Sequence, residues 1–313
     1  MPIARFRDYM TKKQLEPIQR RLNSTEGKAL ADSKLAFHDK CLEVGLPSPP
    51  IYALLTRSNT EDLTNGIPVI SNAEKFLELL IAQGDATYVL KPQQGWHGEG
   101  LRRFHLAGSK IAYLVDGVEC LEEPHTYLSS LLSKTDAYLL QKSMMPHEAL
   151  RSLMPGAGMG TVRVVTVNSQ QGARVTFACA KIPMGDNVSD NFVGGQAGNL
   201  VASVDLETGA LGTVYAPGPV IPTVLASVDR HPVTGLSFTG YCYPNWSAIK
   251  DLALRAASKF DSLYTAGWDI ALTTDGPVLI ETNWRYDVDI LQIASQRPLR
   301  SEMISSLAQR KHS

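Results

Sequence analysis

The sequence feature that most constrains the fold is a pair of strand-forming runs separated by a short polar turn. Residues 161–167 (TVRVVTV) and 174–182 (RVTFACAKI) are rich in β-branched and apolar side chains, which favour extended strands. The residues that follow the first run (NSQQG) end in glycine, a composition typical of hairpin turns. The two runs therefore predict neighbouring antiparallel strands, which favours an α+β fold over a doubly wound parallel sheet.

The remaining pattern places strands in hairpins and helices in blocks, and it predicts three parts. Residues 1–50 are expected to be an N-terminal helical segment with a Pro-rich connector, in which Asp32 or Ser33 caps a helix that ends at Gly45. Residues 51–135 form a first compact region and residues 136–313 a second one. Further strands are predicted at 51–56, 68–70, 87–92, 111–114, 137–141, 267–272 and 277–281, and helices at 71–83, 247–264 and 298–311.

Composition excludes some classes of partner and leaves a cytoplasmic enzyme as the expectation. The 313 residues include 30 Lys plus Arg and 31 Asp plus Glu, so no overall charge attracts nucleic acid or an acidic membrane surface. The four cysteines share no C-x-x-C spacing, which suits a reducing compartment. From the sequence we expect no leader peptide, and no run of apolar residues is long enough to span a membrane.

A glycine-rich stretch that follows a predicted strand is a candidate phosphate-binding loop. Lys91 ends the strand, and Gly95, Gly98 and Gly100 follow it. Glycines let backbone N–H groups approach phosphate oxygens, and a lysine adds a point charge. The order of residues is not that of a Walker loop. The alternative is a plain Gly-rich hairpin with a surface lysine.

Near the C-terminus, two predicted strands form a second hairpin that carries acidic and amide side chains. Glu281 and Asn283 are two residues apart on one strand, so both side chains lie on the same face. We expect a three-residue loop, 274–276, that pairs Thr273 with Pro277. Counting back along both strands then places Asp269 opposite Glu281.

Asp269, Glu281 and Asn283 are candidate ligands for Mg²⁺. Carboxylate and amide oxygens are the donors that this cation prefers, with phosphates and waters completing its shell. Two facing carboxylates would repel each other without a cation. The alternative is a solvated hairpin with its acidic residues turned outward, and the apolar neighbours of these residues argue against it.

The 161–167 strand contains an arginine among β-branched residues. Arg163 is therefore either paired structurally or directed into a cleft. Lys181 lies on the next predicted strand, and the segment 190–195 (DNFVGG) follows it.

Taken in order, these stretches resemble the ATP-grasp superfamily, and more narrowly the sugar-transfer-associated ATP-grasp proteins, which are related to the α-L-glutamate ligases. The resemblance spans about residues 30–290 and rests on eight stretches. They are DSK at 32–34 with GLPSP at 45–49, VLKP at 89–92 with its glycines, LLQK at 139–142, TVRVVT at 161–166, DNFVGG at 190–195, HPVTG at 231–235, GWDIA at 267–271 and ETN at 281–283.

The resemblance implies a fold of two α+β lobes whose antiparallel sheets clasp ATP, and it implies roles for single residues. Lys91 would hold the α- or β-phosphate, and the glycines of the Gly-rich stretch would also bind the nucleotide. Gln141 and Lys142 would meet the adenine through their backbone, and Glu148 the ribose hydroxyls. Asp269, Glu281 and Asn283 would bind one or two Mg²⁺ ions. Arg163 and Lys181 would contact the γ-phosphate. Asn191 and the glycine pair 194–195 would line the acceptor side.

The implied activity is an ATP-dependent ligase that joins a carboxylate to an amine through an acyl phosphate. Its partners would be small molecules, such as an amino acid or a carboxylated sugar, with a homodimer as a candidate assembly. The alternatives are a phosphotransferase on the same fold and a nucleotide-binding protein without turnover. Two departures from the family pattern are expected: an N-terminal domain that is missing or much reduced, and Lys181 at a position where many relatives have arginine.

Overall fold

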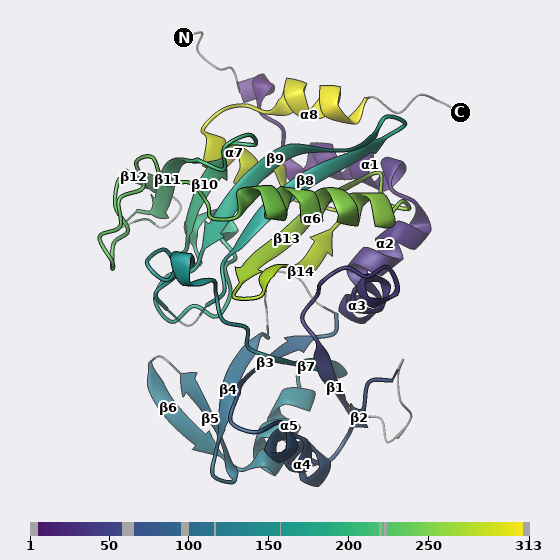
Figure 1. The fold of residues 1–313 in the computed structure, drawn as a ribbon, viewed down its shortest axis with the longest axis vertical. Helices are drawn as coiled ribbons and strands as arrows, with labels where there is room; N and C mark the ends of the chain where they lie inside the picture. Colours follow the sequence, from purple (N-terminus) through teal and green to yellow (C-terminus); the bar gives the residue numbers. More distant parts are fainter. Residues whose placement is uncertain are drawn as a thin grey trace. The chain divides into compact units, whose positions relative to one another are not determined.

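The computed structural model describes residues 6–57, 66–94, 100–115, 117–156, 158–218, 221 and 224–308. Contacts divide the chain into two compact units (Figure 1). The larger unit comprises Met1–Asp32, Lys40–Ser48 and Met145–Ser313, and the smaller one comprises Ser33–Asp39 and Pro49–Met144. Each unit is built on one seven-stranded, mainly antiparallel sheet, and the α+β prediction is confirmed.

The sheet of the smaller unit has the strand order β2-β1-β7-β3-β4-β5-β6. Only the β1–β2 pair is parallel among the strands described. Two helices, α4 (Ala73–Gln83) and α5 (Pro124–Leu132), cover one face. The strands are β1 (Ile51–Thr56), β2 (Val69–Ile70), β3 (Thr87–Pro92), β4 (Arg102–Ala107), β5 (Lys110–Val115), β6 (Val118–Glu122) and β7 (Ala137–Lys142).

The core of the smaller unit is aromatic and aliphatic. Tyr88 stacks on Phe104 with ring centroids 5.4 Å apart, and Phe104 also contacts Tyr127 of α5 at 5.5 Å. Tyr88 is fully buried, yet its hydroxyl donates to the carbonyls of Leu80 and Gly84. The face of β3 that carries these rings is fixed by strand alternation, so Lys91 lies on the opposite face.

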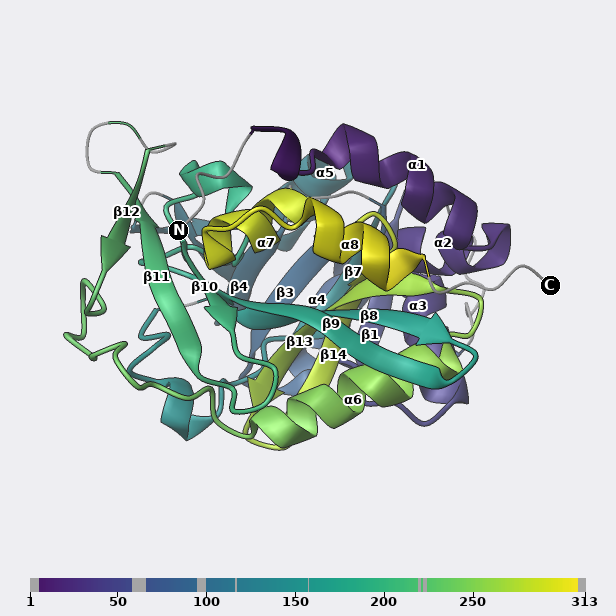
Figure 2. The same ribbon diagram turned by 90° about the horizontal axis from the view of Figure 1, so that it is seen from above.

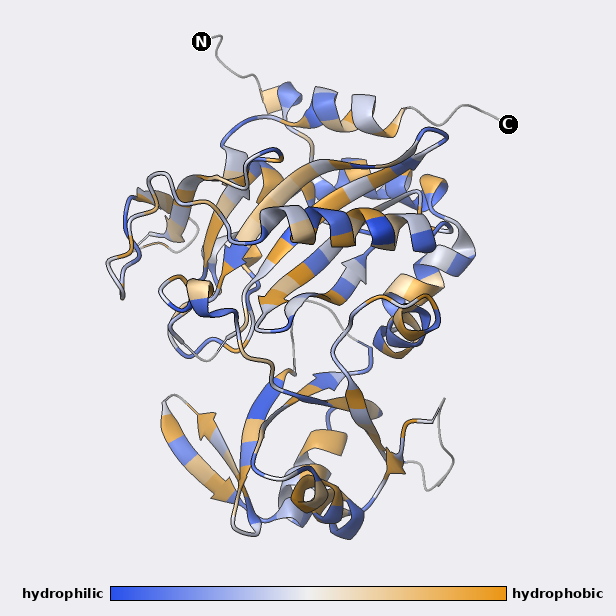
Figure 3. Ribbon diagram, in the orientation of Figure 1, coloured by the Kyte–Doolittle hydropathy of each residue, from blue (hydrophilic) through white to orange (hydrophobic). Residues whose placement is uncertain are grey.

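The sheet of the larger unit has the order β12-β11-β10-β9-β8-β13-β14, with every described pair antiparallel. Helix α6 (Trp246–Lys259) covers one face, and α1 (Lys12–Leu22), α7 (Val288–Ser295) and α8 (Arg300–Leu307) lie on the other (Figure 2). Hydrophobic residues dominate the central strands (Figure 3), and all of β13 is buried. The strands are β8 (Thr161–Ser169), β9 (Gly172–Ile182), β10 (Leu200–Val204), β11 (Leu211–Pro217), β12 (Leu225–Val228), β13 (Thr265–Thr273) and β14 (Gly276–Asn283).

The N-terminal helices α1, α2 (Thr25–Asp32) and α3 (Lys34–Glu43) form as expected. The Ser33 hydroxyl accepts the Ala36 N–H at 3.2 Å, which identifies the cap. Gly45 ends α3 with φ of 68°, a conformation that favours glycine. Asn23, just after α1, exchanges two hydrogen bonds with the backbone of Thr265, each 3.0 Å long, so α1 and α2 are an integral part of the larger unit.

Two details of the structure differ from the sequence predictions. The division between units falls after Met144 rather than after residue 135, because β7 pairs with β1 on one side and β3 on the other. Helix α6 ends at Lys259, before the predicted end at residue 264. The next residue, Phe260, turns inward and packs against Trp268, with ring centroids 5.4 Å apart.

Several elements were not anticipated from sequence. These are β4, β6, α5, β10, β11, β12 and α7. Among the described residues, no helix is both long and apolar enough to cross a membrane.

Candidate functional site

The β13–β14 hairpin places Asp269 opposite Glu281, as the sequence predicts. The predicted turn is wrong, however, because Thr273 pairs with Gly276 across a two-residue loop. An irregularity between Asp269 and Ile270 then shifts the register by one residue. The shift restores the expected pairing at the end of the hairpin that carries the acidic residues.

Asp269 lies at the centre of a buried ionic cluster formed with strands β8 and β9. Arg163 donates from Nε to Oδ1 of Asp269 at 2.8 Å and from Nη2 to Oδ2 at 2.7 Å. Lys181 donates from Nζ to the same Oδ2 at 3.0 Å and to Oδ1 of Asp190 at 3.1 Å. The Thr161 hydroxyl donates to the other oxygen of Asp190. The cluster therefore links three neighbouring strands and the segment that follows β9.

Strand register explains why these residues meet. Arg163 is the direct cross-strand partner of Asp269 on β13, and Thr161 is the partner of Lys181 on β9. Side chains two residues apart share a face, so Thr161 and Arg163 lie on the same side of β8. Cys179 and Val165 on that side belong to the core that α7 and α8 cover. The cluster thus occupies a polar end of an otherwise apolar sheet face.

The pKa shifts of Arg163, Lys181 and Asp269 all favour the ionised form of each group. Burial alone would raise the pKa of Asp269, but Arg163 and Lys181 outweigh it and hold that pKa well below its usual range. Burial would lower the pKa of Lys181, and the carboxylates of Asp190 and Asp269 more than offset this and raise it. The same balance, with Asp269 as partner, raises the pKa of Arg163. The structure thus pairs Arg163 with Asp269.

Glu281 and Asn283 supply oxygen atoms beside this cluster. Both are half-buried on β14, and the Asn283 amide donates to Oε1 of Glu281 at 3.3 Å. Glu281 also contributes to the raised pKa values of Arg163 and Lys181, which indicates that its charge lies near theirs. A carboxylate and an amide on one strand, with Asp269 opposite, are hard oxygen donors that fit Mg²⁺. Asp269 differs from the other two because both of its oxygens already accept from cations.

The segment between β9 and β10 is held by a residue that the sequence analysis missed. Asn199 is 1% exposed. Its Oδ1 accepts from the Met184 N–H and from the Asn187 amide, and its Nδ2 donates to the carbonyls of Ser189 and Asn191. No sequence signal marked this asparagine, because its partners are loop atoms that only the fold brings together.

The predicted acceptor residues lie in this same segment. Asn191 donates from its side chain to the Ser189 hydroxyl at 2.8 Å. Val193 is 49% exposed and has φ of 46°, an unusual conformation for a β-branched residue, and Gly194 and Gly195 also have positive φ. Such backbone strain is found at ligand-binding loops more often than elsewhere.

The residues predicted to bind nucleotide are divided between the two units. Lys91, Gly100, Gln141 and Lys142 lie in the smaller unit, and Glu148 is an exposed residue at the start of a short 3₁₀ turn in the larger one. Gly95 and Gly98 lie outside the described residues.

The local structure explains why two of these positions, 100 and 141, carry the residue types that they do. Gly100 has φ of 75°, and a Cβ there would come within 2.9 Å of the Pro92 ring, so a side chain would not fit. Gln141 is 7% exposed, and its amide donates to the Pro49 carbonyl at 3.0 Å. That bond ties the end of β7 to the segment that leads into β1.

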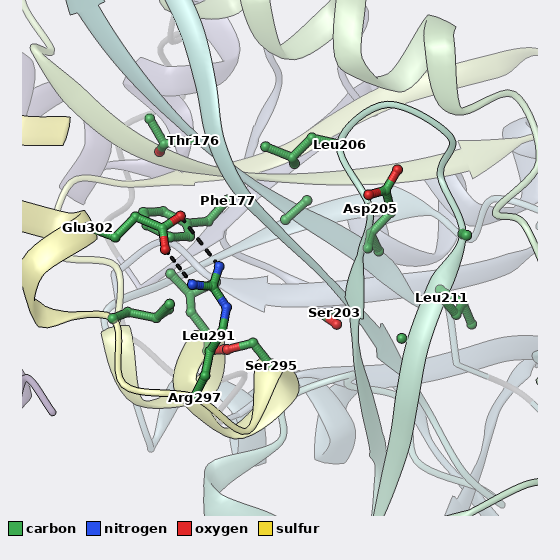
Figure 4. Close-up of a pocket in the computed structure, with 15 residues that line it drawn as sticks. Thr176, Phe177, Ser203, Asp205, Leu206, Leu211, Leu291, Ser295, Arg297 and Glu302 are labelled. Atoms are coloured by element: carbon green, nitrogen blue, oxygen red, sulfur yellow. Dashed lines mark hydrogen bonds and ion pairs between the residues drawn. The ribbon is translucent and has the colours of Figure 1, made fainter. Parts of the chain in front are cut away.

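A separate cavity of about 390 Å³ lies in the larger unit, away from the ionic cluster. Its walls come from β9, β10, β11 and the segment joining α7 to α8 (Figure 4). Arg297 and Glu302 form an ion pair at its rim, and Phe177 and Leu291 are part of its apolar lining. The described residues that line it include none of those predicted for catalysis or nucleotide binding.

The fold and the site together define a member of the ATP-grasp class. The family model described as sugar-transfer associated ATP-grasp matches residues 14–307. The chain belongs to this family. Among curated proteins, none matches it significantly.

Two solved structures of enzymes are similar to this chain. Biotin carboxylase from Campylobacter jejuni, in complex with β,γ-ATP, matches with a TM-score of 0.51 at 11% identity, covering 96% of this chain and 52% of that one. D-alanine–D-alanine ligase from Bacillus anthracis matches with a TM-score of 0.45 at 12% identity, covering 90% and 66%. The chain thus spans between half and two thirds of these proteins.

Proposed function

We propose that this protein is an ATP-dependent carboxylate–amine ligase. The observation that carries the proposal is the buried cluster of Arg163, Lys181 and Asp269, with Glu281 and Asn283 beside it. It places two fixed cations and three oxygen-bearing side chains on one sheet face of a family member. Cations held in place before the reaction stabilise charge that develops during phosphoryl transfer, without a cost of reorganisation.

The nucleotide roles follow from the resemblance and fit the local structure. Lys91 lies on the sheet face opposite the aromatic core of the smaller unit, and its ammonium group would contact phosphate oxygens on that face. Gln141 and Lys142 end β7, two residues before the chain passes to the larger unit. Their backbone groups would meet the adenine. Asp269, Glu281 and Asn283 would hold Mg²⁺, which neutralises charge on the phosphates when it is bound.

In the reaction, an oxygen of the substrate carboxylate attacks the γ-phosphorus. The bond from that phosphorus to the β–γ bridging oxygen breaks, giving ADP and an acyl phosphate. Arg163 and Lys181 compensate the charge on the transferred group. The amine then attacks the acyl carbon, the carbon–oxygen bond to phosphate breaks, and an amide, phosphate and a proton are released.

Asn191 and the strained segment around Gly194 and Gly195 would line the acceptor side. The hydrogen bonds of Asn199 hold this loop in one conformation. A preformed loop lowers the entropy cost of ordering the site when a substrate binds. The candidate substrates are small carboxylates and amines, including amino acids and carboxylated sugars.

The test is a screen for ADP release over pairs of amino acids and carboxylated sugars, with products identified by mass spectrometry. The ligase proposal predicts ADP, phosphate and an amide only when the carboxylate and the amine are both present. A stable phosphorylated product formed without an amine would show a phosphotransferase instead. No ADP release and no nucleotide binding would point to neither enzyme.

A further inference from the structure

The carboxylate of Asp269 already interacts with two cationic side chains. Its two oxygens accept three hydrogen bonds, two from Arg163 and one from Lys181. Its side chain is 3% exposed. A divalent cation that binds Asp269 would therefore lie beside two positive charges and compete with them for the carboxylate, in a site that water barely reaches.

The two donors are held differently. Lys181 has a second anionic partner, Asp190, which is itself held by the Thr161 hydroxyl. Among the ion pairs of the described residues, Arg163 contacts Asp269 alone. If Asp269 were withdrawn, Lys181 would keep a counter-ion, but the guanidinium of Arg163 would be left buried and unpaired. An unpaired buried charge is strongly unfavourable.

We propose that Arg163 prevents a metal ion from binding the Asp269 carboxylate. The block ends when a nucleotide phosphate replaces this carboxylate as the hydrogen-bonded partner of Arg163. A guanidinium binds carboxylate and phosphate with the same two-pronged geometry, so a phosphate is a suitable replacement. Asp190 acts as a positioning residue that keeps Lys181 in place through the exchange. The inference rests on the proposed function, because it takes the incoming phosphate from ATP.

The exchange also balances charge. Arg163 and Lys181 carry two positive charges, and Asp190, Asp269 and Glu281 carry three negative ones. A divalent cation alone would make the net charge of this near-neutral cluster positive, and it would also deprive Arg163 of its carboxylate partner. A cation that arrives with phosphate brings compensating negative charge. Metal and nucleotide should therefore bind together and each strengthen the other.

The test measures Mn²⁺ binding by electron paramagnetic resonance in the absence of nucleotide. Wild type should bind Mn²⁺ weakly, because Asp269 is occupied. Arg163→Gln should bind it at least about tenfold more tightly, since one oxygen of Asp269 is released while Lys181 stays on Asp190. Arg174→Gln is the matched control, because Arg174 lies on β9 and bonds to the Ser306 carbonyl outside the cluster.

If wild type and Arg163→Gln bind Mn²⁺ with equal affinity in the absence of nucleotide, the proposed blocking role of Arg163 is wrong. Adding Glu281→Gln to Arg163→Gln should remove the gained affinity if the metal binds on this hairpin. Retention of the gained affinity would also overturn the proposal, because the metal would then bind elsewhere.

If Arg163→Gln does not fold, Asp269→Asn decides the matter. In the absence of nucleotide, Asp269→Asn and wild type should have the same Mn²⁺ affinity, including none detectable, because the carboxylate is not available. If Asp269→Asn binds Mn²⁺ more weakly than wild type in the absence of nucleotide, the proposed blocking role of Arg163 is wrong. Calorimetry with a non-hydrolysable ATP analogue separates the two ideas, because a wild type that binds no nucleotide contradicts the proposed function, whereas equal nucleotide-free Mn²⁺ affinities in a protein that does bind nucleotide contradict only the inference about Arg163.

Discussion

In the smaller unit, one face of the sheet is packed by aromatic rings that α4 and α5 cover, with Tyr88 and Phe104 at its centre. In the larger unit, a sheet with the same number of strands buries Arg163, Lys181, Asp190 and Asp269 among its apolar residues. An aromatic core stabilises the fold through burial and packing. Buried ion pairs add little net stability, because desolvation offsets their attraction. We therefore propose that the charges serve the reaction, whereas the aromatic core stabilises the fold.

The largest expected effect is on the free energy of unfolding. It compares the destabilisation caused by removing one partner of the ionic cluster with the net contribution of the intact ion pair to stability. Asp269→Leu should lower the free energy of unfolding by about 3–5 kcal/mol, because it leaves Arg163 buried without a partner. Adding Arg163→Met should recover most of that loss, since an apolar pair replaces an ion pair. Chemical denaturation measures both. If the double variant is no more stable than Asp269→Leu, the cluster is a stabilising element and the comparison fails.

Phe104→Ala is the matched change in the smaller unit. It should cost about 3–5 kcal/mol through lost burial and a cavity. No change of charge elsewhere should rescue it, which contrasts with the expected rescue in the larger unit.

The next prediction concerns activity without a loss of stability. Glu281→Gln should lower ATP turnover by at least about a hundredfold, because the proposed metal site loses a carboxylate. Its melting temperature without ligand should stay the same or rise slightly, since a negative charge opposite Asp269 is removed. Thermal melting and ADP release measure the two quantities, with Glu207→Gln on an exposed turn as control. Wild-type turnover in Glu281→Gln would remove this residue from the site.

A smaller effect is expected in the smaller unit. Lys91→Ala should weaken ATP binding by about tenfold, the size of one lost charge-assisted contact, and leave the aromatic core intact. Calorimetry with a non-hydrolysable analogue measures it. Lys110→Ala, which removes an exposed ion pair between β5 and Glu123, is the control. Unchanged affinity in Lys91→Ala would show that this lysine does not contact the nucleotide.

The smallest effect concerns pH. Burial lowers the pKa of His231, and its neutral Nδ1 accepts the N–H groups of Val233 and Thr234 at 3.2 Å each. Because the unfolded chain binds the proton more readily, this contribution to stability is complete above the unfolded pKa, near 6.5, and is lost as pH falls below it.

His231→Asn keeps a side-chain acceptor but cannot be protonated. Melting temperatures between pH 8 and 5 should therefore fall less steeply in this variant than in wild type. Some slope should remain, because burial also lowers the pKa of His38. His105→Asn, an exposed histidine on β4, is the control. An unchanged slope in His231→Asn would contradict the assignment.

Much of the fold and part of the candidate site could be predicted from the sequence. Runs of apolar and β-branched residues marked β1, β3, β8 and β9, with a polar turn between the last two, because these signals act over a few residues. The pairing of Asp269 with Glu281 also followed from local spacing, although the turn and the irregularity that produce it did not. The missed strands β10–β12 have weaker periodicity and depend on neighbours for burial.

The sequence by itself determined the family, the class of fold and which polar residues stand on which strands. Only the tertiary structure decided that Arg163 pairs with Asp269, a residue 106 positions away, and that β7 belongs to the smaller sheet. It also gave Asn199 its four partners. The physical reason is that strand propensity is local, whereas strand order and the partners of a buried charge depend on segments that are distant in sequence.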